Sequence, residues 1–174
     1  MKRNNPIIIA EIGCNHMGSL KLAEKLIEQA SICGANYVKF QKRNNRYLLG
    51  KDYEKPHPVP ENSFGKSYGE HRDFLEFNIK QHLKLINICK KNNIGYSTSV
   101  WEKKSAQEFC KIQNKLNFIK VPSACNLDFE LLDELCRKFK KKIHVSLGMT
   151  TQKEVILIYN FFKKRKRNKD LVFY

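Results

Sequence analysis

The 174-residue sequence has no apolar run that approaches the ~20 residues a membrane-spanning helix needs, which excludes a transmembrane protein. Residues 1–6 are polar and basic, and no small-residue cleavage site follows the short apolar run at 7–10, so export is not expected. The six cysteines form neither a Cys-x-x-Cys pair nor a zinc pattern spaced with histidines. Together these absences predict a reduced, cytoplasmic protein.

Acidic residues are also scarce. The chain has 17 Asp and Glu against 33 Lys and Arg, a net charge of +16, and six of the cations lie within residues 163–169. Such an excess is typical of proteins that bind polyanions. However, 26 of the cations are lysines, and a sequence rich in Lys, Asn and Ile also reflects AT-rich coding. We therefore interpret residues 163–169 as a solvated helix end and do not expect nucleic acid as a partner.

Length and composition predict one domain. With 174 residues, 41% hydrophobic and 29% charged, the chain can bury a full core but cannot hold two enzyme domains. Short β-type runs alternate along it with amphipathic helical patterns. The expected strands are residues 7–12, 36–41, 94–100, 117–122, 143–147 and 171–174.

Helix signals fall between these strands. Ser19 is placed to cap the first helix and Gly34 to end it, while Thr151 and Glu154 form a capping box for the last. One interval is longer than the others because it holds an insertion at residues 42–77. The prolines and glycines of this insertion exclude a long regular element, so we expect a long loop, which in a compact domain is usually either functional or disordered.

The repeated β-α order requires a parallel sheet covered by helices, either doubly wound or closed as a barrel. A doubly wound sheet gathers its ligand groups at one crevice, whereas a barrel gathers them around the rim. Here polar residues close one expected strand after another: Glu11 and Asn15, Lys39 and Gln41, Ser97 to Ser99, Lys120 and Ser123, and Ser146. The α/β pattern therefore favours a TIM-type (β/α) barrel, with about six of its eight β/α units in this chain.

Lys39 and Lys120 are the most informative residues of this rim, because a buried charge is costly without a partner or a ligand. Two such cations predict an anionic ligand that carries a phosphate and a carboxylate. Two alternatives stay open from the residues alone. Lys39 forms a structural ion pair with Glu11, or one of the lysines acts as a Schiff-base nucleophile. The hydroxyl residues expected to converge with the lysines are Thr98, Ser123 and Ser146.

Five spaced motifs together resemble those of the sialic acid synthase family. The sequence departs from the family pattern at Pro122, where Gly is common, and at Leu147, where Ser or Thr is common. The motifs are IAEIGCNHMGS within residues 8–19, GANYVKFQ at 34–41, YGEHR at 68–72 with LE at 75–76, IKVPSACN at 119–126, and SLGM at 146–149.

The resemblance implies condensation of phosphoenolpyruvate with N-acetylmannosamine or a related acylamino sugar, which yields a nonulosonic acid and phosphate. It implies that Glu11, Lys39 and Lys120 form the catalytic set. It also implies a divalent metal, manganese or magnesium, that polarises the aldehyde and whose ligands are expected outside this chain. The substrate-binding residues implied are Gln41, Thr98, Ser123, Ser146, Asn15 and His71.

Several other residues have competing interpretations. His16 either touches substrate or shapes the turn after the first strand, and His71 either enters the site or fixes the insertion. Cys14 and Cys125 are interpreted as small hydrophobic residues rather than nucleophiles. Trp101 is interpreted as a packing residue.

The resemblance also implies that residues 1–174 are an incomplete N-terminal barrel domain. Two strands are missing, and so is the antifreeze-like C-terminal domain that caps the partner's site in the family's homodimer. The alternatives are an inactive or split-gene fragment that retains only an anion site, and a basic polyanion-binding protein.

Overall fold

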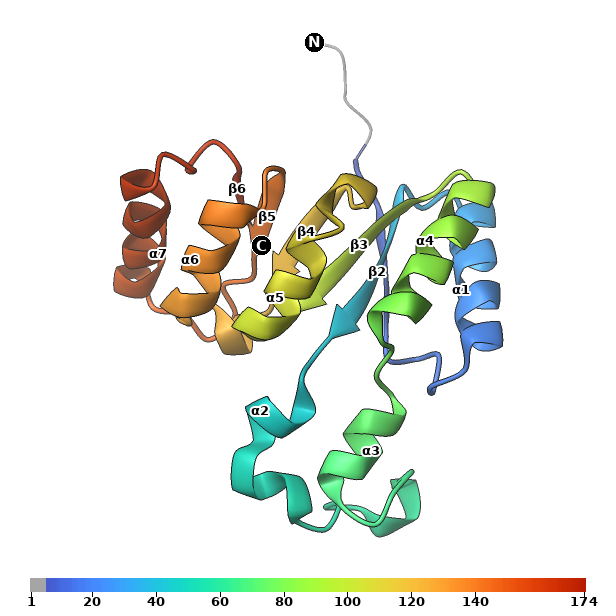
Figure 1. Cartoon of the computed structure of the whole chain (residues 1–174). Coiled ribbons are helices and arrows are strands. Elements are labelled where there is room, and N and C mark those ends of the chain that lie inside the picture. Colours follow the sequence, from blue (N-terminus) through green and yellow to red (C-terminus); the bar gives the residue numbers. More distant parts are fainter. Residues whose placement is uncertain (1–5) are drawn as a thin grey trace.

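Six parallel strands form one sheet in the computed structural model, which describes residues 6–174 (Figure 1). Their order across the sheet is their order in the chain. A doubly wound sheet reverses at a switch point, so this sequential order is that of a barrel. The strands are β1 (Ile9–Gly13), β2 (Tyr37–Lys42), β3 (Gly95–Val100), β4 (Phe118–Val121), β5 (Lys142–Val145) and β6 (Leu171–Phe173).

Amphipathic helices cover one face of the sheet (Figure 1). The predicted capping signals are present in the first and the last of these helices. The Ser19 hydroxyl caps the first helix, and Gly34 with φ of +80° follows its end. Thr151 and Glu154 form the capping box of the last helix. No helix in residues 6–174 is long and apolar enough to cross a membrane. The covering helices are α1 (Leu20–Ile32), α4 (Ile79–Lys91), α5 (Lys103–Cys110), α6 (Phe129–Lys138) and α7 (Gln152–Lys164).

The core lies between the sheet and these helices. Side chains of a strand alternate between its two faces, and fully buried residues such as Val38, Ile119 and Val145 point toward the helices. The positions between them include Lys39 and Lys120, which therefore point to the opposite, inner face. The hydrophobic side of the sheet thus builds the fold and leaves the inner side for polar chemistry.

The insertion at residues 42–77 is more ordered than the loop expected for it. It projects beyond the carboxyl ends of the strands (Figure 1). Tyr53 packs directly on Gly69, where an added Cβ would lie 2.3 Å from the ring, and Asp73 accepts hydrogen bonds from Tyr53 and from Asn45 (2.8 Å). Its prolines exclude a long helix but not short ones. These are α2 (Asn45–Leu49), η1 (Gly50–Glu54), η2 (Pro60–Asn62) and α3 (Tyr68–Phe74).

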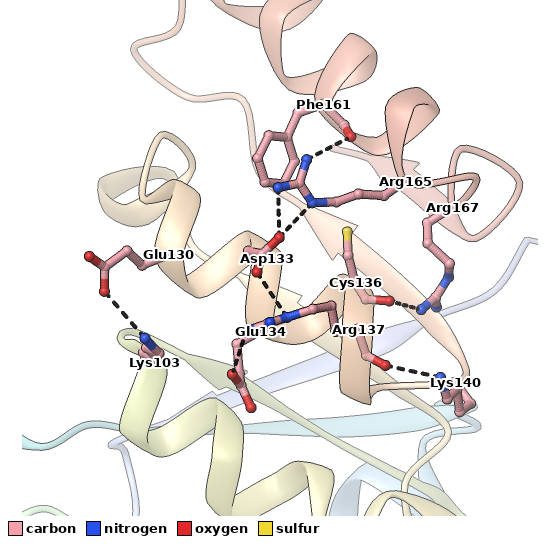
Figure 2. A network of polar contacts seen from close by, with 10 residues as sticks. All are labelled: Lys103, Glu130, Asp133, Glu134, Cys136, Arg137, Lys140, Phe161, Arg165 and Arg167. Atoms are coloured by element: carbon pink, nitrogen blue, oxygen red, sulfur yellow. Dashed lines mark hydrogen bonds and ion pairs between the residues drawn. The ribbon is translucent and has the colours of Figure 1, made fainter.

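The interpretation of residues 163–169 as a simple solvated helix end was wrong for two arginines (Figure 2). The Arg165 guanidinium lies over the Phe161 ring and donates to Asp133 (2.7 Å). Arg167 pairs with Asp170 and donates to backbone carbonyls of the α6–β5 segment. Both arginines hold the C-terminal β-α unit together, and only the lysines of the stretch stay exposed.

Two buried histidines give the fold a predictable pH dependence. His82 is fully buried, with Nδ1 against the Tyr96 hydroxyl, and His16 stacks on Phe77 with ring centroids 4.0 Å apart. Burial lowers the pKa of His82 to about 3 and that of His16 to about 4. The unfolded chain, whose histidines have a pKa near 6.5, therefore takes up protons that the native state refuses, and stability falls as the pH drops below 6.5.

His82→Gln is expected to flatten this fall by about 1.4 kcal/mol per pH unit between pH 6 and 4.5, because one fewer proton is taken up on unfolding. The measurement is the free energy of unfolding in urea at several pH values. An unchanged slope in the variant would show that His82 is protonated in the native state.

Candidate active site

The inner face of the sheet carries polar residues in two neighbouring rows. Paired residues of parallel strands point to the same side, so the strand register brings side chains from β1 to β4 together there. One row joins Glu11, Lys39 and Ser97, and the next joins Gln41, Ser99 and Lys120.

Lys39 is almost fully buried, with 2% of its side chain exposed, and its ammonium group contacts the Glu11 carboxylate. The structural ion pair considered from the sequence is therefore present. Glu11, however, is 69% exposed, so water already solvates it. Its carboxylate can leave Lys39 for a ligand without becoming a buried unpaired charge.

Lys120 is half-buried and has no ion-pair partner within residues 6–174. Its pKa lies below the usual range, chiefly because of burial and then because of the nearby Lys39 charge. It lines a hollow of about 390 Å³ with Glu11, Ser146 and Tyr174. Since these residues come from β1, β4 and the ends of β5 and β6, the sheet curves strongly, as a barrel wall does.

The predicted serines lie at the same edge. Ser123, in the turn η4 (Ser123–Cys125) after β4, accepts a hydrogen bond from the Gly148 backbone N–H (3.1 Å). A Cβ at Gly148 would lie 2.8 Å from the Ser123 hydroxyl, so this close approach requires glycine. Asn126 donates to the Ser146 carbonyl (3.0 Å). These bonds tie the ends of β4 and β5 together beside Lys120.

Thr98 is not brought to this surface. It is fully buried and shares the helix-facing side of β3 with Tyr96, whose hydroxyl contacts His82 of α4. The inward positions of β3 belong to its neighbours Ser97 and Ser99. Ser97 donates its hydroxyl to the Phe118 carbonyl (2.8 Å), which leaves Ser99 as the β3 hydroxyl beside Lys120.

Gln41 meets the end of β1, where a strand irregularity precedes Gly13. A Cβ on Gly13 would lie 2.9 Å from Gln41 Nε2, so the glycine, at φ of +56°, admits the amide. The Gln41 Oε1 atom is buried and has no hydrogen-bond partner in the part of the chain that the structure describes. An unpartnered buried acceptor is costly, so this oxygen is suited to a donor group of a ligand.

Asn15 and His71 lie farther out. Asn15 is exposed in the turn after β1. His71 lies in α3, where its ring stacks on Phe64 and its Nδ1 accepts from the Phe64 backbone N–H (3.3 Å). These contacts give His71 the role of fixing the insertion. No contact among the described residues links it to Lys39 or Lys120.

The other residues weighed from the sequence have structural roles. His16 is buried and its Nδ1 accepts from the Gly18 backbone N–H (3.1 Å), so it shapes the turn after β1. Burial raises the pKa of Cys125 to about 11 and also raises that of Cys14, which argues against thiolate chemistry. Residues 6–174 contain no group of three or more side chains arranged to hold a metal, so they do not fit a divalent metal by themselves.

A second polar cluster at this end of the sheet was missed by sequence reasoning. Arg43, directly after β2, is buried with its guanidinium 3.9 Å from the centroid of the Trp101 ring. Glu76 lies 3.8 Å from the Arg43 guanidinium and accepts from the Arg43 backbone N–H (3.1 Å). Burial raises the pKa of Glu76 to about 7. Trp101 thus packs as predicted, but against a cation, and only the motif residue Glu76 hinted at this cluster.

Comparison with curated proteins finds several relatives that are named as synthases. The chain is 35% identical over 153 residues to an N-acetylneuraminate-9-phosphate synthase of Drosophila melanogaster, which covers 85% of this chain and 39% of that protein. It is 34% identical over 166 residues to the human enzyme of the same name, covering 92% and 44%. An N,N'-diacetyllegionaminic acid synthase of Campylobacter jejuni is 33% identical, covering 86% and 44%. The chain therefore spans less than half the length of these relatives.

Solved structures give the same fold. An N-acetylneuraminic acid (sialic acid) synthetase from Leptospira borgpetersenii, in complex with citrate, matches with a TM-score of 0.78 at 25% identity and covers 97% of this chain and 53% of that one. A DAHP synthase from Thermotoga maritima matches at 0.64 and 15% identity over 96% and 41%, a likeness of fold alone. Both confirm the predicted TIM-type barrel. The model of the NeuB family matches residues 26–174, and the chain belongs to this family.

Proposed function

We propose that this chain provides the phosphoenolpyruvate site of a NeuB-type synthase, which condenses phosphoenolpyruvate with an acylamino sugar to a nonulosonic acid and phosphate. The supporting observation is Lys120, a half-buried cation without an ion-pair partner in residues 6–174, held beside the buried Lys39. A bound dianion would relieve the repulsion between the two cations. Family membership and the names of the relatives support the same reaction class.

The proposed roles follow the two rows of the inner face. Lys39 and Lys120 neutralise the phosphate and carboxylate of phosphoenolpyruvate, with hydroxyls of Ser123 and Ser146 beside them. Ser99 takes the position that the resemblance implied for Thr98. Glu11, which lines the hollow, and Gln41, whose buried Oε1 has no hydrogen-bond partner among the described residues, contact the sugar.

The chemistry requires positioning and charge stabilisation. The methylene carbon of phosphoenolpyruvate forms the new bond to the sugar aldehyde carbon, positive charge develops at the carbon that bears the phosphate, water adds there, and phosphate leaves. The chain holds the anionic reactant rigidly on barrel strands, which lowers the entropic cost of this step. A divalent metal would polarise the aldehyde when bound, and we propose that its ligands lie outside this chain.

Ser99→Ala is expected to weaken phosphoenolpyruvate binding about fivefold, the effect of one lost hydrogen bond, whereas Thr98→Val should leave it within about twofold. The matched pair removes one hydroxyl from each face of β3. Calorimetric titration with phosphoenolpyruvate measures both affinities. If Thr98→Val has the larger effect, the assignment of β3 faces to ligand and core is wrong.

The condensation itself is tested by mass spectrometry for a nine-carbon sugar acid. The chain is incubated with phosphoenolpyruvate, Mn²⁺ and either N-acetylmannosamine or N-acetylmannosamine 6-phosphate, together with a polypeptide covering the part of a NeuB-family relative that this chain does not match. Product that depends on the chain and is lost in Lys120→Met supports the proposal. Phosphoenolpyruvate binding without product in the mixture would reduce the function to anion binding.

A further inference from the structure

A second hollow, of about 280 Å³, lies at the same end of the sheet as the proposed phosphoenolpyruvate site. Its wall comes from strand ends on one side and from α2 and α3 of the insertion on the other. Leu48 and Leu49 supply apolar surface. The residues that give it chemical character are Arg43, Tyr68, Arg72, Trp101 and Cys125.

The buried side-chain atoms of this hollow that lack a hydrogen-bond partner among the described residues are both donors. These atoms are Arg43 Nε and Trp101 Nε1, neither of which has a hydrogen-bond partner within residues 6–174. Arg72 has no ion-pair partner within residues 6–174 and only the Tyr68 ring beneath it, 5.9 Å from the guanidinium carbon. Unsatisfied buried N–H groups cost free energy, so the hollow is suited to a group made of acceptors.

The nearby carboxylates leave this donor character in place. Glu76 faces Arg43, but burial raises its pKa to about 7, so it is only partly charged near neutral pH. Asp73, next to Arg72 in the chain, is occupied by Asn45 and Tyr53. Two guanidinium groups with spare N–H donors match the three acceptor oxygens and double charge of a phosphate monoester.

A short segment at the end of β4 contributes to both hollows, with Lys120 in the first and Cys125 in the second. Cys125 lines the second hollow, and the charges of both Arg43 and Lys120 act on its thiol and oppose the rise in its pKa. Ser123, two residues earlier, accepts a hydrogen bond from the Gly148 backbone N–H, two residues after Ser146, which lines the first hollow. A ligand that reacts beside Lys120 can therefore extend toward Arg72.

The carbon numbering of the product shows which end of the sugar lies away from the new bond. Phosphoenolpyruvate supplies carbons 1 to 3 of a nine-carbon product, so the aldehyde carbon of the hexose becomes carbon 4 and its carbon 6 becomes carbon 9. Carbon 6 is thus the end remote from the new bond. The Drosophila and human relatives are named as synthases of a 9-phosphate, whereas the Campylobacter relative is named for a product without phosphate.

We propose that the hollow lined by Arg43 and Arg72 is a phosphate subsite, and that the sugar substrate is a 6-phosphorylated acylamino hexose. This inference rests on the proposed function and names its substrate class. Arg72 supplies the charge-assisted contacts from the insertion, and Arg43, fixed between Trp101 and Glu76, supplies them from the strand end.

The test is calorimetric titration of the full chain with N-acetylmannosamine 6-phosphate and with N-acetylmannosamine, in EDTA and saturating phosphoenolpyruvate. The wild type should prefer the phosphorylated sugar by at least about tenfold, and Arg72→Gln should lose most of that preference. Arg72→Lys, which keeps the charge, should retain part of it. Arg46→Gln is the matched control, because it removes an exposed arginine of the same insertion outside the hollow.

Each outcome decides the proposal. Equal binding of the two sugars by the wild type, binding of neither, or a preference that survives Arg72→Gln would overturn it. Phosphoenolpyruvate affinity is measured in the same samples. A loss of that affinity in Arg72→Gln would mean that the hollow holds the phosphate of phosphoenolpyruvate instead. A wild type that fails to bind phosphoenolpyruvate refutes the proposed function itself, which separates the two failures.

Discussion

Replacing Lys39 and Lys120 together by methionine is expected to lower phosphoenolpyruvate affinity more than about a hundredfold, because each ammonium group donates a charge-assisted hydrogen bond to the ligand. The fold should persist. Glu11, the partner that Lys39 leaves behind, is 69% exposed and stays solvated. Removing Lys120 also relieves its repulsion from Lys39, which already lowers its pKa.

Calorimetric titration measures the affinity, and circular dichroism at rising temperature verifies the fold. The control is Lys153→Met with Lys163→Met, which removes the same charge from exposed positions on α7. Affinity unchanged in the site variant would refute the anion site. Equal losses in both variants would show that overall charge, rather than the two converging lysines, attracts phosphoenolpyruvate.

Arg167→Met is expected to lower the free energy of unfolding by about 3 kcal/mol, the largest stability effect that we predict, because it leaves several buried acceptors unpaired. Arg167 donates to the Cys136 carbonyl (2.7 Å), as Figure 2 shows. It also donates to the carbonyls of Phe139 (2.6 Å) and Lys141 (3.1 Å) and pairs with Asp170. Only 13% of its side chain is exposed, so water replaces few of these bonds.

Urea denaturation followed by circular dichroism gives the free energy. Lys164→Met is the matched control, since it removes an exposed cation three residues away and should change stability by less than about 0.5 kcal/mol. A loss in Arg167→Met no larger than in the control would mean that the α6–β5 connection holds without the arginine.

Local sequence signals predicted the positions of the strands and of the helix caps well. The ends of the observed strands fall within two residues of those predicted, and the first and last of the covering helices begin directly after the predicted caps Ser19 and Thr151. Ser19 and the Thr151–Glu154 pair were decisive because a helix cap involves only residues within one turn. Sequential β-α order likewise narrowed the fold to two topologies, and polar strand ends favoured the barrel that the strand order confirms.

The face of the sheet on which a side chain lies, and the distant residues that it contacts, were harder to predict from the sequence. Thr98 and Ser99 are adjacent polar residues in one buried strand, and composition does not say which of them points inward. The answer follows from pairing with β2 and β4, whose partner residues lie 58 and 21 positions away in the chain, respectively. The same limit applies to Arg167. Unlike the neighbouring lysines, it is held in place by carbonyls of Cys136 and Phe139, which are distant in the chain.

The sequence by itself determined the β-α alternation, the helix caps, the family and the two lysines of the rim, because these depend on residue type and on short spacing along the chain. Only the tertiary structure decided that Ser99 rather than Thr98 lies beside Lys120, that the insertion folds into short helices, and that Arg43 and Arg72 share a hollow. Those features depend on strand register and on packing between distant segments. Register and packing are set by the whole molecule, because the native fold leaves few buried polar groups unpaired.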